Sequence, residues 1–546
     1  MLSFTKGDWK FLWIIFSVVV VLTFLPIFFG YLTTPPDKVF LFKPNVNGGD
    51  FVVYYSYIEQ IKGGNFLFKN FFTSEAQPIH VFNTFWLLAG LFAKIFNLSA
   101  PFAIQILRFL FIFPFLIAAY YLLSFFFEDS FKKKVCFIIF IFASGLGGVF
   151  SLDPQIQDKF LDLFVPEAFT FLTLYTEPHF ILSLILFISI IFLSIKALSD
   201  YKLKYSLLVG LFSLILFSFH PYHVYSVFLI LFSFGVVEYF IRTKLNFNYI
   251  KHFIIVSLLS LPSILYQLWT IISIPAVYQH LLQNVTLTPS LQIVIISYGF
   301  LIPLAIIGSV LIIKNKQRSH LELMLVVWFV CQLFLLYLPV KTQIRLSEGL
   351  QFPIAILVTC GIFYLKDIFV QKIKNSNLLN SMIHQKISLN MFLIYLFFVL
   401  FFVSSATVLY TDILLYSAQY KSFYISKAEY ESINWLNNTP ENSIILSSYY
   451  TGNVIPGFVS RQVFIGHSHE TANFKEKEKE TQDFLKNYDS SQRASFLKEN
   501  NINYLFWGPE EKLGANFNPN DDNFLQKVYE NGEVSIYKVN ESQIPI

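Results

Sequence analysis

Long blocks of apolar residues recur along this chain and constrain its fold more than any other feature of the sequence. Two clear examples are residues 11–29 and 181–195. A helix of about 20 apolar residues matches the ~30 Å hydrocarbon core of a membrane. Charged residues make up 14% of the chain, whereas soluble domains carry about 25%. The sequence therefore predicts an all-α polytopic membrane bundle over residues 1–411 and a small α/β soluble domain over residues 412–546.

The basic residues between these blocks predict the orientation of the bundle, because Lys and Arg are enriched in cytoplasmic loops. A full span over residues 79–96 would invert every later basic cluster. If this segment, flanked by His80 and Lys94, lies along the outer face as an interfacial helix, all clusters are cytoplasmic, and we adopt this solution. The clusters are Lys6 and Lys10, Lys132–Lys134, Lys202 and Lys204, Arg242 with Lys244 and Lys251, Lys314 with Lys316 and Arg318, and Lys366–Lys386.

This solution predicts about eleven spans in a multi-pass plasma-membrane protein. The N-terminus is then cytoplasmic, the C-terminal domain is extracytoplasmic, and residues 33–101 form the first outer loop. The first apolar block is interpreted as an uncleaved span, because it is long and no small-residue cleavage site follows it. The predicted spans are 11–32, 102–127, 134–150, 178–198, 204–220, 222–241, 252–272, 292–313, 320–339, 352–370 and 388–411.

An acidic residue, Asp50, stands early in the first outer loop, directly after Gly48 and Gly49. An acid at the start of an amphipathic stretch is often a helix cap. A carboxylate at the membrane–water boundary can also act as a general base. These residues alone leave both roles open.

Further polar residues lie at the outer ends of later spans. Glu177 precedes Pro178 and His179, which is an ordinary helix start, but an acid and a His beside an apolar helix are costly unless they are solvated or used. Glu167 lies earlier in the same outer segment. The next outer turn contains two His that either bind metal or phosphate or simply line a wet turn. It consists of His220, Pro221, Tyr222 and His223.

Two cations, Lys341 and Arg345, lie at an outer span end, where the positive-inside rule disfavours them. The guanidinium fork suits phosphate oxygens. The alternative is a pair between Arg345 and Glu348 on one helix face.

The tail alternates helix-like and strand-like segments. Residues 443–447, 502–507 and 534–539 are strand-like, and Asn531-Gly532 predicts a hairpin turn. The helix-like segments are 429–437 and 475–485. His467, Ser468 and His469 are interpreted as ordinary loop residues. The cysteines, none of which is in the tail, predict no disulfide framework, and the net charge of +4 gives no indication of a nucleic-acid partner.

The layout of the chain resembles the C-type glycosyltransferase superfamily (GT-C), which uses polyprenyl-phosphate-linked sugar donors. Members place an Asp early in a long first outer loop, an acid–Pro pair before a later span, and an outer Arg near the donor phosphate. Asp50, Glu177-Pro178 and Arg345 fit these places. The stretch 431–443 is similar to the segment that opens the soluble domain of the oligosaccharyltransferase catalytic subunit. Its Trp-Trp-Asp-Tyr-Gly signature is replaced here by Ser448-Tyr449-Tyr450-Thr451-Gly452, which lacks both Trp and the Asp and argues against transfer to Asn in a sequon.

The resemblance implies an inverting transferase acting outside the membrane on a lipid, glycan or protein acceptor. Asp50 would act on the acceptor hydroxyl and Glu177 would position it. The resemblance requires no cofactor; if a divalent ion is used, Asp50 and Glu177 would share Mg²⁺ or Mn²⁺. The residues implied at the donor phosphate or substrate are Arg345, Lys341, His179, His220, Tyr222 and His223.

Three other functions compete with this interpretation. A transporter or flippase would show repeats and midplane ionisable residues, whereas here the polar residues lie at span ends. A polysaccharide polymerase or ligase usually carries a large outer loop in mid-chain. The third is a non-enzymatic membrane protein whose tail binds a partner.

Overall fold

The computed structural model describes residues 4–79, 81–151, 160–200, 202–243, 246–374 and 386–543. His80, Lys244 and the stretch 375–385 of the last basic cluster lie outside these residues. The chain forms two compact units, each made of three stretches of sequence. The first unit comprises Met1–Pro26, Leu107–Tyr266 and Thr286–Asp412, and the second comprises Ile27–Ile106, Gln267–Val285 and Ile413–Ile546. The division of the chain at residue 411 stays a prediction.

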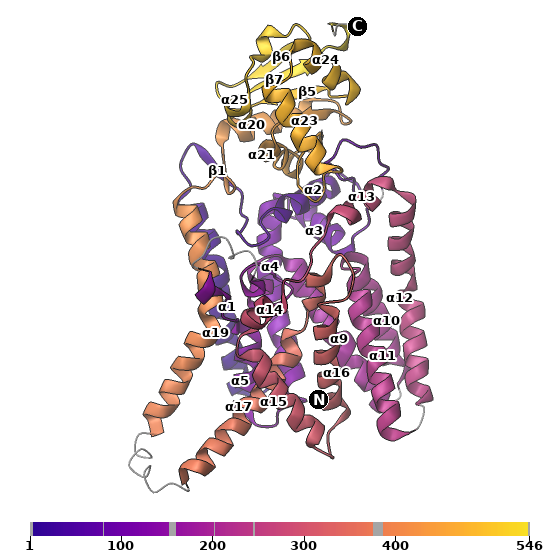
Figure 1. The fold of residues 1–546 in the computed structure, drawn as a ribbon, viewed down its shortest axis with the longest axis vertical. Coiled ribbons are helices and arrows are strands. Elements are labelled where there is room, and N and C mark those ends of the chain that lie inside the picture. The colour runs from indigo at the N-terminus through magenta and orange to yellow at the C-terminus, as the bar shows by residue number, and fades with distance from the viewer. Residues whose placement is uncertain are drawn as a thin grey trace. The chain divides into compact units, whose positions relative to one another are not determined.

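Long apolar helices dominate the chain (Figure 1). Seven of the described helices are long and apolar enough to cross a membrane, or eight if one bent pair forms a single span. Helices occupy every segment predicted as a span, and the prediction of a polytopic helical bundle is confirmed. These helices are α1 (Lys6–Leu32), α4 (Ala100–Leu123), α5 (Ser130–Phe142) with α6 (Gly147–Phe150), α9 (Pro178–Asp200), α10 (Leu203–Phe219), α11 (His223–Arg242), α12 (Phe247–Ser273), α14 (Leu291–Tyr298) with α15 (Leu301–Lys314), α16 (His320–Leu335), α17 (Gln351–Lys374) and α19 (Lys386–Ser417).

The predicted span 292–313 is broken into two helices. The axes of α14 and α15 meet at 82°. Gly299 makes the joint with a φ of +50°, a conformation that glycine adopts without the steric cost of a Cβ. Hydrophobic periodicity carries no information about this dihedral angle, so the sequence predicts one continuous helix.

The segment predicted to lie along the membrane forms α3 (Thr84–Ile95). Its 12 residues give a length of about 18 Å, too short for a ~30 Å hydrocarbon core. Asn83 caps the helix by accepting a hydrogen bond from the Trp86 N–H at 3.1 Å. α3 packs on α2 (Asp50–Lys62), where Trp86 stacks on Tyr54 with ring centroids 4.2 Å apart. Its length supports the prediction that this segment does not span.

The C-terminal region of the second unit is a three-layer α/β fold, which confirms the predicted α/β class. Its sheet has the order β4-β3-β5-β7-β6, parallel across β4, β3 and β5 and antiparallel at β7. Asn531-Gly532 joins β6 to β7, as predicted. The strands are β3 (Ile444–Leu446), β4 (Gln462–Val463), β5 (Tyr504–Trp507), β6 (Leu525–Glu530) and β7 (Ser535–Val539).

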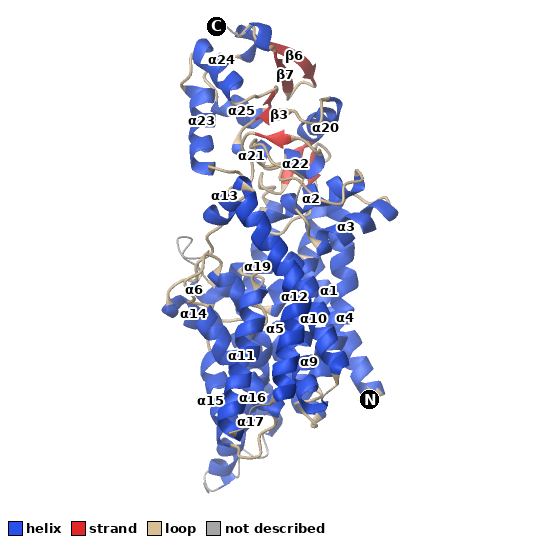
Figure 2. Ribbon diagram, turned by 90° about the vertical axis from the view of Figure 1, so that its right-hand side faces the viewer, coloured by secondary structure: helices blue, strands red, loops and turns tan. Residues whose placement is uncertain are grey.

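Side chains alternate between the two faces of this sheet. Leu446 and Leu505 pack against Phe484 of α23 (Phe474–Lys486), together with α24 (Ser490–Glu499). Ile445 and Phe506 pack against α20 (Lys427–Trp435) on the other face. Figure 2 shows α23 and α24 on one side of the sheet and α20 on the other.

Short elements complete the two units. β1 and β2 pair antiparallel and connect the first predicted outer loop to the start of the C-terminal region within the second unit. The short elements are β1 (Lys38–Phe40), α7 (Leu161–Phe164), α8 (Thr170–Tyr175), α13 (Pro275–Gln283), η2 (Gln343–Ser347), β2 (Tyr424–Ser426), η4 (Leu436–Asn438), α21 (Tyr449–Gly452), α22 (Ile455–Phe458), α25 (Pro509–Gly514), η5 (Pro519–Asp521) and η6 (Glu541–Gln543).

Candidate functional site

Asp50 begins α2, and its carboxylate meets a histidine from the C-terminal region of the same unit. Oδ1 of Asp50 lies 3.1 Å from Nε2 of His467. The His467 side chain is 6% exposed and that of Asp50 is 25% exposed, so the pair joins a buried imidazole to a solvent-accessible carboxylate. Gly49, not Asp50, occupies the N-cap position of α2.

Backbone contacts orient the His467 ring. Its Nδ1 accepts a hydrogen bond from the backbone N–H of His469 at 3.3 Å, which in the neutral ring leaves Nε2 as the donor to Asp50. Burial acts to lower the pKa of His467, but the hydrogen bond and charge of Asp50 and the charge of Glu470 outweigh it and raise the pKa above 6.5. The ring therefore holds one oxygen of Asp50 and favours its ionised form.

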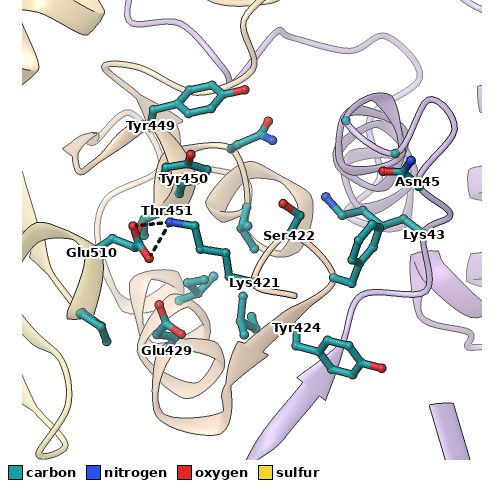
Figure 3. Close-up of a pocket in the computed structure, with 18 residues that line it drawn as sticks. Lys43, Asn45, Lys421, Ser422, Tyr424, Glu429, Tyr449, Tyr450, Thr451 and Glu510 are labelled. Carbon is teal, nitrogen blue, oxygen red and sulfur yellow. Dashed lines mark hydrogen bonds and ion pairs between the residues drawn. The ribbon is translucent and has the colours of Figure 1, made fainter. Parts of the chain in front are cut away.

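A cavity of about 320 Å³ opens beside Gly49 (Figure 3). The loop just before Asp50 contributes Lys43 to it, and burial lowers the pKa of Lys43 to about 8. On the other wall, Lys421 Nζ lies 3.1 Å from an oxygen of Glu510 and 3.9 Å from the ring centroid of Tyr450. The cavity thus offers charges of both signs and phenol groups to a polar ligand. The stretch Tyr449–Thr451, which stands where the oligosaccharyltransferase signature would be, lines the same cavity.

The turn 220–223 of the first unit, predicted to be an outer turn, converges on Glu348, which follows η2. Glu348 Oε2 accepts a hydrogen bond from the Tyr222 hydroxyl at 2.6 Å and lies 2.9 Å from His223 Nε2 and 3.3 Å from His220 Nδ1. Its Oε1 accepts a hydrogen bond from the hydroxyl of Ser183 in α9. All five residues are buried, and we refer to them as the Glu348 cluster.

The backbone around Glu348 is held by α16. Gln332 Nε2 donates to the carbonyl oxygens of Glu348 at 2.6 Å and Leu346 at 3.2 Å, and Gln332 Oε1 accepts from the indole N–H of Trp328. Burial acts to raise the pKa of Glu348, but His223 and His220 outweigh it and hold the pKa of this carboxyl well below its usual range. The cluster therefore contains an ionised carboxylate.

The remaining predicted site residues belong to the first unit. Glu177 is fully buried at the start of α9, and His179 lies with its ring centroid 5.0 Å from that of His220. Arg345 is half-buried in η2, three residues before Glu348, and Lys341 is exposed just before η2. The structure thus brings His179, His220, Tyr222 and His223 together. Asp50 belongs to the other unit, and an ion shared by Asp50 and Glu177 stays a prediction.

His467 and Glu348, on which these two sites are centred, are not site predictions of the sequence analysis. His467 is interpreted there as a loop residue, and Glu348 only as a partner for Arg345. His467 and Glu348 each contact residues that are distant in the sequence, and the spacing of residues along the chain does not reveal such contacts. For Glu348, an acid beside two cations at a span end is a usable signal, because a carboxylate there is costly without a partner.

Known protein families and curated protein sequences provide no match to this chain. Solved structures do. An oligosaccharyltransferase from Archaeoglobus fulgidus, tethered with an acceptor peptide containing the NVT sequon, is 12% identical with a TM-score of 0.55, and the match covers 99% of this chain and 75% of that one. ArnT from Cupriavidus metallidurans, bound to undecaprenyl phosphate, is 10% identical with a TM-score of 0.52, covering 99% of this chain and 100% of that one. The mycobacterial arabinofuranosyltransferase AftD is 12% identical with a TM-score of 0.50, covering 96% of this chain and 41% of that one.

These three proteins are C-type glycosyltransferases of different specificity, and the shared feature is the fold. The chain therefore has the GT-C fold, and the fold that the resemblance implies is confirmed. It is an integral membrane protein, because membrane-length apolar helices make up the body of this fold.

Proposed function

We propose that this protein is an inverting glycosyltransferase that moves a sugar from a polyprenyl-phosphate donor to an acceptor on the extracytoplasmic side of the membrane. The observation that carries the proposal is the Asp50–His467 pair, in which a buried imidazole holds a part-exposed carboxylate at 3.1 Å. Gly49, the residue before Asp50, lines the cavity that contains Lys43 and Lys421. Proteins of the same fold support the donor class: AglB from Archaeoglobus fulgidus has been solved with a dolichol-phosphate, and ArnT with undecaprenyl phosphate.

The proposed reaction is a single displacement. The acceptor hydroxyl oxygen bonds to the anomeric carbon of the sugar, and its proton passes to Asp50. The bond between the anomeric carbon and the phosphate oxygen breaks, and the lipid phosphate leaves with the electron pair. Arg345 and Lys341 bind the phosphate oxygens, and Glu177 and His179 position the reactants. One displacement inverts the anomeric configuration, which NMR of the product would detect.

The cavity beside Gly49 is proposed to bind the acceptor. Lys421, Glu510 and Tyr450 provide charge and hydrogen bonds to a polar glycan or lipid headgroup. Ser448-Tyr449-Tyr450 in place of Trp-Trp-Asp argues for an acceptor other than an Asn sequon.

The test compares Asp50→Asn with a matched acid from the same loop. Asp37→Asn removes an exposed carboxylate and is the control. The purified full chain is incubated with radiolabelled polyprenyl-phosphate sugars and an envelope-lipid and glycan extract, and release of polyprenyl phosphate is scored. Asp50→Asn should lower the rate by at least ~100-fold, the contribution of a general base, while Asp37→Asn keeps it.

If Asp50→Asn elutes as wild type does in size-exclusion chromatography and keeps full activity, Asp50 is not required for the reaction. If the protein moves intact donor across the membrane of proteoliposomes without releasing lipid phosphate, the result would instead favour a flippase.

A further inference from the structure

Three buried side chains of the Glu348 cluster present ligand atoms to one another across the first unit. His220 and His223 come from the α10–α11 turn, and Glu348 follows η2. One ligand atom from each lies within 4.8 Å of those of the other two. This is a two-imidazole, one-carboxylate set of the kind that binds Zn²⁺ in proteins.

The spacing of these atoms already matches a bound ion. Ligands at about 2.1 Å from a tetrahedral Zn²⁺ lie about 3.4 Å from one another. Glu348 Oε2 lies 3.3 Å from His220 Nδ1 and 2.9 Å from His223 Nε2. An ion would need shifts of only a few tenths of an ångström at these two contacts.

His223 supplies an independent observation. Its side chain is 0% exposed, and neither ring nitrogen forms a hydrogen bond of normal geometry within the described part of the chain. An imidazole buried in this way loses its hydration without full compensation by hydrogen bonds. A cation between His223 Nε2 and Glu348 Oε2 would accept a lone pair from each of the two atoms.

Two neighbouring hydroxyls complete the environment. The Tyr222 hydroxyl lies 2.6 Å from Glu348 Oε2 and 2.9 Å from His220 Nδ1, which makes it the nearest group for a fourth ligand. The Ser183 hydroxyl donates to Glu348 Oε1 and so orients the carboxylate, as partners of metal ligands commonly do.

We propose that His220, His223 and Glu348 bind one Zn²⁺ ion that fastens the α10–α11 turn to the segment carrying Lys341 and Arg345. The ion is structural, because its ligands are buried, and it sets the position of Arg345 relative to the bundle. This proposal does not depend on the transfer reaction, since metal binding is measured without any donor or acceptor.

The experiment measures zinc in the full chain in detergent, after removal of any affinity tag. Protein stripped with a chelator is titrated with Zn²⁺ alone by calorimetry, and bound metal is counted by mass spectrometry. Wild type should bind one ion per chain. His223→Ala and Glu348→Gln should weaken binding by more than the ~10–100-fold that loss of a supporting partner costs, and Ser183→Ala by that smaller amount.

His320→Ala is the matched control, because His320 also contacts an acid, Glu238, at 2.5 Å but outside the cluster. Its zinc binding should equal that of wild type. X-ray absorption of zinc-loaded wild type should show two imidazole ligands and requires no variant to fold. The proposal would be overturned if wild type bound no zinc, or if His223→Ala and Glu348→Gln bound zinc as tightly as wild type. A zinc spectrum without imidazole ligands would also overturn it.

Discussion

At the scale of single residues, the position of the Asp50 carboxylate depends on the imidazole ring of His467, which comes from the C-terminal region of the chain. His467 is buried and its Nδ1 is held by the backbone, so Nε2 has little freedom to leave the Asp50 carboxylate. The acidic residue could be predicted from the sequence because it follows a Gly-Gly pair in a loop predicted to be outer. Its partner could not, because the contact is set by how the second unit folds.

His467 is expected to act as a positioning residue. His467→Gln replaces the imidazole N–H donor with an amide N–H donor, whereas His467→Ala leaves no side-chain donor. His467→Ala should lower kcat about tenfold or more and move the acidic limb of the pH–rate profile to higher pH, because the carboxylate loses a group that favours its ionised form. His467→Gln should recover part of both effects. An unchanged pH profile in His467→Ala would mean that the ring does not act through Asp50.

A second acid, Asp162 in α7, gives a pH-dependent prediction for stability. It is 1% exposed, and burial raises its pKa to about 7, against hydrogen bonds from Ser404 and the Gly147 N–H. Because the folded pKa exceeds the unfolded value of 3.8, its contribution to stability is fully present below about pH 4 and is lost as the pH rises through 7.

Asp162→Asn, which stays neutral, should therefore unfold at a higher temperature than wild type at pH 8.5. The two should differ little at pH 4, as measured by thermal scanning in detergent. A difference that does not change with pH would contradict the raised pKa.

At the scale of elements, helix positions follow from apolar block length, whereas bends and close contacts follow from individual glycines. Where α15 and α17 run side by side, a Cβ on Gly308 would lie 2.1 Å from the Leu357 carbonyl oxygen. Small residues allow such close backbone approach between membrane helices. Strands β3, β5 and β7 of the C-terminal region were predictable from local alternation, whereas the two-residue strand β4 was not. Their order was not, because β3 lies between β4 and β5 through non-local pairing.

Gly308→Ala should destabilise the bundle by about 1–3 kcal/mol, as overpacking does. The measurement is the unfolding temperature in detergent. Gly7→Ala is the control, because a Cβ at Gly7 meets only Thr5 Oγ1 at 3.6 Å. Equal unfolding temperatures for Gly308→Ala and wild type would show that the helices can separate there without cost.

At the scale of the whole molecule, a common fold at 10–12% sequence identity indicates a shared architecture but does not identify the substrate. The donor class is proposed from proteins of the same fold, and the acceptor from the cavity beside Gly49. The proposed side of the membrane depends on the distribution of Lys and Arg, which is a property of the sequence.

Cysteine labelling tests that orientation. Leu513→Cys introduces a thiol at a position 84% exposed in the C-terminal region, and Gln317→Cys introduces one in the exposed loop between α15 and α16. A membrane-impermeant thiol reagent should label Leu513→Cys in intact cells and Gln317→Cys only after permeabilisation. The reverse pattern would place the C-terminal region in the cytoplasm.

The central claim is tested most directly by mass balance in a purified reaction. Wild-type protein, a radiolabelled polyprenyl-phosphate sugar and an envelope extract should give free polyprenyl phosphate and labelled acceptor in a one-to-one ratio. Asp50→Asn should form both products at least ~100-fold more slowly. Lipid phosphate released at the same rate by Asp50→Asn, or no transfer from any donor by well-folded wild-type protein, would contradict the assignment as a glycosyltransferase that works through Asp50.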